Sequence, residues 1–136
     1  DGLVLPLFSP AMQEKLRVGL AAEASAGNPV DMIASASPEQ YGACLRELLA
    51  SDEIDSVMVI YIPTAPRASR DVEQAVADVV AEGTKGKTVL AVFMQADDGD
   101  LGPINKGEIS IPSYAFPEPA ARALAQAARS ADAAGR

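Results

Sequence analysis

Two continuous apolar runs constrain the fold of this chain more than any other feature. Residues 57–62 and 89–93 are rich in β-branched side chains and show no alternation of apolar with polar residues. A strand has this composition when both faces of its sheet are covered, which is the usual situation in a parallel sheet. We therefore expect two parallel strands in the interior of a sheet, with helices on both faces.

Two helices have well-marked beginnings. Ser9 and Ser37 each precede a proline, which is the arrangement of an N-cap followed by proline at the first helical position. Gln40 can return a hydrogen bond to Ser37 and complete a capping box. We expect one helix from residue 10 to about residue 24 and another from residue 38 to about residue 51. Their apolar stripes comprise Met12, Leu16 and Leu20 in the first, and Tyr41, Cys44, Leu45, Leu48 and Leu49 in the second.

Two further helices follow the apolar runs. The third is expected to end at Gly83, and its stripe comprises Val72, Ala75, Val76, Val79 and Val80. The fourth begins at Pro117, and its packed side is nearly all alanine, namely Ala120, Ala121, Leu124, Ala127, Ala128 and Ala131. Small side chains imply that this helix closely approaches the sheet or a neighbouring helix.

Two weaker strands and a loop complete the expected order. Residues 3–8 are expected to be a strand that ends at Ser9, and residues 95–107 a polar loop. Residues 109–114 form a weak strand that suits a sheet edge, because Pro112 lacks a backbone donor. Strands alternating with helices in 136 residues predict one domain of the α/β class, a three-layer parallel sheet of the flavodoxin-like or Rossmann-like kind.

The charge balance argues against some partners. The chain has 19 acidic residues, 11 basic residues and no histidine, which gives a net charge of −8. A charge of this sign opposes binding to the phosphate backbone of nucleic acid. The apolar runs are far shorter than the ~20 residues needed to cross a bilayer, and the amino terminus lacks the basic segment of a targeting signal. The single cysteine, Cys44, is expected to be a core residue of a cytoplasmic protein.

Motifs of catalytic sites are absent from the sequence. It has no histidine for acid–base chemistry, no cysteine–histidine cluster for zinc, and none of the glycine-rich phosphate loops. Asp97, Asp98 and Asp100 could offer oxygen ligands to a hard cation, but they lack EF-hand spacing, and a solvated acidic turn is the preferred interpretation. We therefore expect neither a metal site nor a complete catalytic site in these residues.

Two segments remain as candidate sites. Arg67 and Arg70 follow the carboxyl end of an expected strand, where ligands of open parallel sheets gather, so they could bind a phosphate or a carboxylate. The alternative is that both are exposed residues of a strand-to-helix loop. The segment Asn28-Pro29-Val30-Asp31 contains two side chains that can order a turn by bonding to local backbone. This segment is either a structural turn or part of a domain contact.

The same segment contributes to a family resemblance that runs nearly from end to end. The matching residues are Asn28-Pro29-Val30-Asp31, Tyr41, Leu48-Leu49-Ala50-Ser51-Asp52, Ile54-Asp55-Ser56-Val57, Ile62-Pro63, Gly86-Lys87-Thr88-Val89, Ile111-Pro112-Ser113-Tyr114 and Pro117-Glu118-Pro119-Ala120-Ala121-Arg122-Ala123-Leu124. With them the chain resembles the ADP-forming (NDP-forming) acyl-CoA synthetases. It is similar to the second of their two succinyl-CoA-synthetase-like flavodoxin modules, which is equivalent to the C-terminal domain of the succinyl-CoA synthetase β subunit.

The resemblance implies a reaction for a larger protein: acyl-CoA + ADP + phosphate ⇌ carboxylic acid + CoA + ATP, with CoA, ATP or ADP, and Mg²⁺ as its ligands. It also implies an acyl phosphate and a phosphorylated histidine, which in the family belongs to the preceding module. Residues 1–136 would then be a non-catalytic fragment of a multidomain chain. Its partners would be the CoA-binding, phosphohistidine and ATP-grasp modules, and an oligomer is compatible with this arrangement.

Two other functions stay open. One is a regulatory synthetase-like domain fused to a GNAT-type protein lysine acetyltransferase, which only flanking sequence would separate from a synthetase. The other is a free-standing flavodoxin-like binding module, which would need a phosphate-binding loop that the sequence does not show after its first strand.

One departure from the family affects the expected sheet. Family members usually begin this module with a strand and a Gly-Gly turn that enters a helix, whereas this sequence begins at Asp1-Gly2-Leu3, after the place of that element. We therefore expect a sheet that has a vacant central position or brings two strands together across it.

Overall fold

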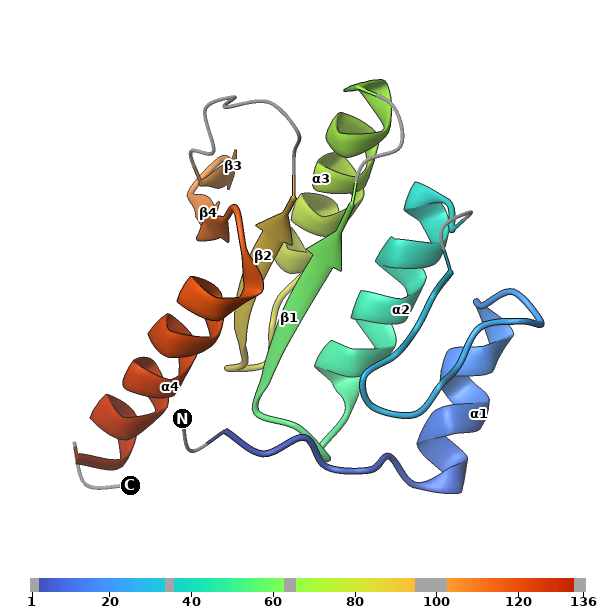
Figure 1. Ribbon diagram of the computed structural model, residues 1–136, viewed down its shortest axis with the longest axis horizontal. Coiled ribbons are helices and arrows are strands. Elements are labelled where there is room, and N and C mark those ends of the chain that lie inside the picture. Colours follow the sequence, from blue (N-terminus) through green and yellow to red (C-terminus); the bar gives the residue numbers. More distant parts are fainter. Residues whose placement is uncertain (1–2, 34–35, 63–65, 95–102, 134–136) are drawn as a thin grey trace.

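A computed structural model describes residues 3–33, 36–62, 66–94 and 103–133, and for residues 66–69 and 131–133 it describes the backbone (Figure 1). The chain combines helices with short strands. In order, the elements are α1 (Pro10–Val18), α2 (Pro38–Ala50), β1 (Ser56–Tyr61), α3 (Pro66–Ala81), β2 (Thr88–Phe93), β3 (Ile104–Lys106), β4 (Ile109–Ile111), β5 (Ser113–Tyr114) and α4 (Pro117–Ala133).

The main sheet is parallel and has the strand order β1-β2-β5. β1 pairs with β2 along its whole length, from Ser56 opposite Thr88 to Tyr61 opposite Phe93. β5 pairs with β2 through Ala91 opposite Ser113 and Val92 opposite Tyr114. β3 and β4 form a separate antiparallel hairpin. Among the described strands, β2 is therefore the centre of the sheet and β1 is an edge.

Helices cover the two faces of the sheet unequally. α2 and α3 pack on one face of the sheet, here called the back face. The strand residues buried there are Val57, Val59, Tyr61, Ala91 and Phe93. On the front face, a smaller cluster joins Leu90 and Val92 of β2 to Ala120 and Leu124 of α4 (Figure 1). The predicted three-layer α/β fold of the flavodoxin-like kind is therefore confirmed.

The helix beginnings follow the capping signals of the sequence. The Ser9 hydroxyl accepts a hydrogen bond from the Met12 N–H at the start of α1. Ser37 and Gln40 form the predicted capping box at the start of α2, with side-chain bonds of 3.1 Å and 2.7 Å. Each cap satisfies backbone donors that the first helical turn leaves without a partner, so these boundaries are local in origin.

The predicted end of α1 was wrong. The helix ends at Val18, not near residue 24, because the N–H groups of Gly19 and Leu20 turn back to the Leu16 and Arg17 carbonyls in a tightened last turn. Gly19 also lies where α1 crosses α2: a β-carbon placed on it would be 3.3 Å from that of Ala43. α1 therefore ends where its backbone closely approaches α2.

The strand predicted for residues 3–8 is also wrong. This segment is extended but pairs with no described strand, and Val4, Leu5 and Leu7 are 81%, 70% and 80% exposed. Only Phe8 enters the core, where it packs with Met12 and Leu16. The apolar composition that predicts a strand is present, but the structure provides no neighbouring strand to pair with it.

β1 differs from its predicted interior position. Its back face is buried, but Met58 is half-buried and Ile60 is 45% exposed on the front face. α4 packs mainly on β2 and β5, so on the front of β1 Met58 contacts the cluster that α4 forms with β2, whereas Ile60 stays exposed. Of the two arrangements expected for a sheet without a first strand, the vacant central position is not seen among the described strands, because β1 pairs with β2 along its whole length.

Residues 109–114 do not form one strand. Ile109–Ile111 belongs to the β3–β4 hairpin, while Ser113 and Tyr114 form the predicted edge strand β5. Pro112 lies between the two pieces, and its carbonyl accepts a hydrogen bond from the Ala91 N–H at 2.9 Å. Pro112, which has no backbone donor, thus separates the residues that pair with β3 from the residues that pair with β2.

α4 packs over only half of its length. Ala120, Leu124 and Ala125 are buried, whereas Ala127 and Ala128 are exposed, contrary to the predicted alanine stripe. The sheet beneath α4 is short, because β5 has two residues. Within the described part of the chain, no helix is long and apolar enough to cross a membrane.

Candidate functional site

The Asn28-Pro29-Val30-Asp31 segment forms a compact turn between α1 and α2. Ser25 and Asp31 bracket it by exchanging two backbone hydrogen bonds of 2.9 Å each, and the Asn28–Pro29 peptide bond is cis. The Asn28 amide donates to the Pro6 carbonyl at 3.0 Å, and Asp31 Oδ1 accepts from the Ile33 N–H at 3.0 Å. Both polar side chains therefore bond to backbone.

The interior of this turn is apolar. Ala26 is fully buried, and Val30 packs against the cluster that Phe8, Met12 and Leu16 form with Cys44 of α2. The turn thus joins residues 6–8, α1 and α2 into one unit. Asp31 itself is exposed, so its carboxylate is available at the surface.

Arg67 and Arg70 lie on a helix and not in the predicted strand-to-helix loop. α3 begins at Pro66, which places both residues in its first turns, and Arg70 is exposed. The side chain of Arg67 lies outside the described residues, as do Asp97, Asp98 and Asp100. Proline at the start of a helix is favourable at its first position, so Pro66 was a signal for this boundary.

Arg70 borders a cavity that the sequence did not predict. The cavity has a volume of about 550 Å³ and lies between α3 and the β3–β4 hairpin, with Glu73 and Gln74 on the helix side and Asn105 on the hairpin side. Partial burial raises the pKa of Glu73, while the positive charge of Arg70 opposes the rise. Gly107 and Glu108, the two residues between β3 and β4, are a Gly-X pair of the kind found in two-residue hairpin loops, and are a weak signal that could have located the hairpin.

Aromatic rings gather at the carboxyl end of β1 and β2. The rings of Tyr41 and Tyr61 meet edge to face at 5.5 Å, and Tyr61 lies 5.6 Å from Phe93. Burial raises the pKa of Tyr41, with smaller contributions from Tyr61, Cys44 and Asp31. Rings in this geometry pack favourably, so this row stabilises the contact of α2 with the sheet.

Cys44 is a core thiol, as its position in the apolar stripe predicts. It is 5% exposed, and burial raises the pKa of its thiol to about 11. The nucleophilic thiolate is therefore scarce at neutral pH. Among the described residues, no three His, Cys, Asp or Glu side chains form a group that could hold a metal ion.

Comparison with known proteins identifies relatives of this chain. No family model matches it. It is 35% identical over 133 residues to the ADP-forming acetate–CoA ligase II subunit alpha of Pyrococcus furiosus, with 94% of this chain and 29% of that protein covered. It is 31% identical over 123 residues to the ADP-forming acetate–CoA ligase I of Archaeoglobus fulgidus, with 90% and 17% covered.

The chain belongs to the ADP-forming acyl-CoA synthetase family. The crystal structure of PH0766 from Pyrococcus horikoshii OT3 matches its fold with a TM-score of 0.67 and 31% sequence identity, over 86% of this chain and 27% of that one. This synthetase-family chain thus spans less than a third of the length of these relatives.

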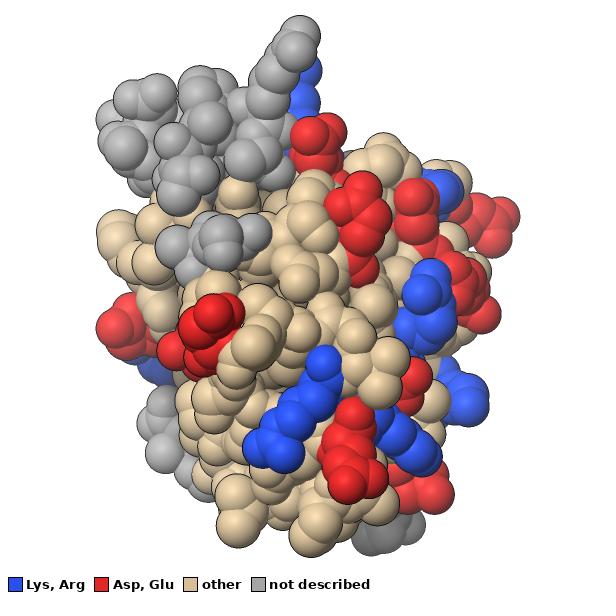
Figure 2. Space-filling view, turned by 90° about the vertical axis from the view of Figure 1, so that its right-hand side faces the viewer, with Lys and Arg blue, Asp and Glu red and all other residues tan. Residues whose placement is uncertain are grey.

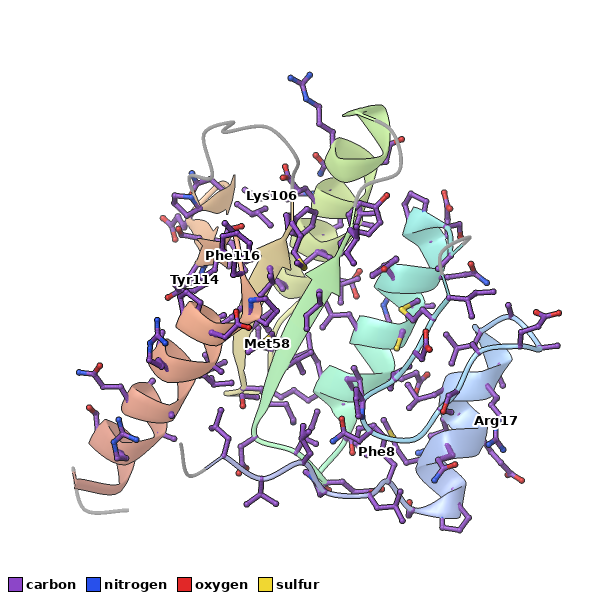
Figure 3. All side chains as sticks on the ribbon, viewed as in Figure 1. Phe8, Arg17, Met58, Lys106, Tyr114 and Phe116 are labelled. Carbon is purple, nitrogen blue, oxygen red and sulfur yellow. The ribbon has the colours of Figure 1, made fainter. Side chains whose placement is uncertain are left out.

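The synthetase-family chain has an uncovered apolar surface on β1. We call it the β1 surface and define it as Met58, Ile60, Ile62 and the edge of β1 that faces away from β2. Ile60 and Ile62 are 45% and 65% exposed, and Phe116, at 59% exposure, lies with Tyr114 and Met58 on the side of the sheet that carries α4 (Figure 3). β1 carries no charged side chain that would deter another chain from pairing with it.

A different face of the molecule carries many charged side chains. On the side that Figure 2 shows, acidic and basic side chains lie next to one another. One ion pair of the molecule joins two helices, since Arg46 of α2 donates two hydrogen bonds of 2.9 Å each to Glu82 of α3. The β1 surface therefore differs from this face in being apolar.

Proposed function

We propose that this chain is a structural and domain-packing module of an ADP-forming acyl-CoA ligase, which interconverts acyl-CoA, ADP and phosphate with carboxylic acid, CoA and ATP. The β1 surface is the observation that carries this role. An apolar, uncharged edge strand with an uncovered face is typical of a surface that another part of the protein covers. The relatives support the ligase part of this proposal, because their names describe an ADP-forming ligase and a subunit of one, and both are much longer than this chain.

In this proposal, the catalytic groups belong to other modules of the ligase. The CoA-binding, phosphohistidine and ATP-grasp modules would bind CoA, the phosphoryl group and the Mg²⁺ complex of the nucleotide. No described residue of this chain is assigned to any of these ligands. The Asn28–Asp31 turn would hold α1 against α2 and so keep the module rigid while β1 docks.

The reaction is tested on the full ligase that contains this sequence. It is incubated with ATP, CoA and acetate, and acetyl-CoA formation, ADP release and acid-labile phosphate on the protein are measured. We expect all three signals from the ligase and none from the 136-residue chain. Absence of all three from the ligase would overturn the ligase function and favour an acetyltransferase fusion.

A matched pair of variants tests the packing role. Ile60→Asp places a charge on the β1 surface, whereas Val18→Asp places the same charge on α1 at a valine that is 90% exposed. Burying an unpaired charge is costly, so Ile60→Asp should weaken docking and lower ligase activity, and Val18→Asp should leave both unchanged. If the ligase is active and Ile60→Asp docks normally, the ligase function stands and the packing role of β1 is wrong.

A further inference from the structure

The cavity between α3 and the β3–β4 hairpin has an organised lining. Arg70, Glu73, Gln74 and Ala77 follow one another at the spacing of a single helix face, and this face looks across about 550 Å³ of open space to Ile104 and Asn105. Ala77 and Ile104 are buried and form an apolar floor. The polar ends of the other side chains surround that floor.

Several of these polar groups have unused bonding capacity. Within the described part of the chain, no hydrogen bond joins the side chain of Arg70, Glu73 or Asn105 to another residue. Gln74 differs, since its amide nitrogen donates to Asp78 at 2.8 Å, and Lys106 pairs with the same carboxylate. Gln74, Asp78 and Lys106 thereby stabilise the wall of the cavity and leave Arg70 and Glu73 facing it.

The two charges of this wall define the chemistry of a ligand. A guanidinium binds a carboxylate through paired N–H donors, and a carboxylate accepts hydrogen bonds from an ammonium group. One cation and one anion three residues apart on a helix match a ligand that carries the opposite pair a few bonds apart. The apolar floor suits a small aliphatic group, and the cavity volume of about 550 Å³ is large enough for one.

We propose that this cavity binds a free α-amino acid with a small aliphatic side chain. Its carboxylate pairs with Arg70, its ammonium group with Glu73, and its side chain contacts Ala77 and Ile104. Asn105 supplies a further polar contact from the hairpin. This site does not depend on the ligase function, because it uses none of the residues of the β1 surface.

The test is a titration of the ¹⁵N-labelled 136-residue chain with L-valine, followed by amide chemical shifts. We expect saturating shifts at Glu73, Ile104 and Asn105. Isobutylamine lacks the carboxylate and 3-methylbutanoate lacks the ammonium group, so neither should saturate. Shifts that do not saturate with L-valine, or that are equal with either half-molecule, would overturn the proposal.

Charge-matched variants provide the control. Arg70→Gln and Glu73→Gln should each weaken L-valine binding by about tenfold, as expected for loss of a charge-assisted hydrogen bond. Arg122→Gln and Glu118→Gln remove an equivalent pair of exposed charges from α4 and should leave binding unchanged. Since all four positions lie on helix surfaces, a dispersed spectrum will show that each variant is folded. Equal affinities in all four variants would contradict the assignment.

Discussion

Asn28 donates a hydrogen bond from its side-chain amide to the backbone carbonyl of Pro6, which lies 22 residues earlier, at 3.0 Å. This bond holds residues 3–8 against the turn that precedes α2. Asn28→Ala should lower the free energy of unfolding by about 1 kcal/mol, and Asn28→Asp by more, because a carboxylate would face a carbonyl. Urea denaturation measures both. Equal stability of Asn28→Asp and the unmodified chain would contradict a role for this bond.

Asp31 has a local role that can be separated from catalysis. Its carboxylate accepts from the Ile33 N–H, and Ile33 has a φ of 62°, a conformation that is costly for a β-branched residue. Asp31→Ala should therefore cost about 1 kcal/mol of stability or loosen the domain contacts, without a specific catalytic defect. The measurement is thermal unfolding together with ligase turnover. A large loss of turnover at unchanged stability would show that Asp31 acts in the reaction.

Cys44 should react only when the protein opens. Its thiol is buried in α2 and has its pKa raised to about 11, so the folded chain should resist a thiol reagent at pH 8. The labelling rate should rise with denaturant in parallel with the unfolded fraction, and the unfolded chain in guanidinium should react at once. Prompt labelling of the folded chain would contradict the burial of this side chain.

Acid should destabilise the fold through three carboxylates. Hydrogen bonds from Ser9 lower the pKa of Glu53, a bond from Lys106 lowers that of Asp78, and a bond from Arg46 lowers that of Glu82. A carboxyl whose pKa is depressed in the folded state contributes stability above its unfolded pKa, near pH 4, and that contribution disappears as the pH falls through the folded value.

The pH dependence has its own control. The three carboxylates are replaced together in one variant, as Glu53→Gln, Asp78→Asn and Glu82→Gln. Its free energy of unfolding should fall less steeply than that of the unmodified chain as the pH drops below about 4. Replacing the exposed Glu14, Glu23 and Glu108 by Gln alters the net charge equally, so this variant separates the effect of net charge from that of the three hydrogen-bonded carboxylates. The slope is read from urea midpoints between neutral and acid pH. A steeper slope in the first variant would refute the assignment.

The parts of the fold that local sequence determines could be predicted. Ser9, Ser37 and the proline after each set the helix beginnings, and the β-branched runs set β1 and β2, because these signals act between neighbours in the chain. The end of α1 could not be predicted, since it depends on the crossing of Gly19 with α2. The edge position of β1 likewise depends on which strands and helices reach it from elsewhere.

In the candidate sites too, features set by neighbouring residues could be predicted, whereas features that depend on distant contacts could not. The Asn28–Asp31 turn could be located from its residue types, but its bond to Pro6 joins segments that the sequence does not relate. Arg70 was found from its place after a strand, whereas the cavity beside it exists only because the β3–β4 hairpin packs on α3. A polar segment with one glycine turn gives a weak signal for such a hairpin.

Hydrogen exchange of β1 tests the packing role most directly. The amide exchange of residues 56–61 is measured by mass spectrometry in the 136-residue chain and in the full ligase, with residues 88–93 of the central strand β2 as the internal control. We expect strong additional protection of β1 in the ligase and little change in β2, because β1 lies at an edge of the described sheet whereas β2 is paired on both sides. Equal exchange of β1 in both samples would show that no other part of the ligase covers the β1 surface.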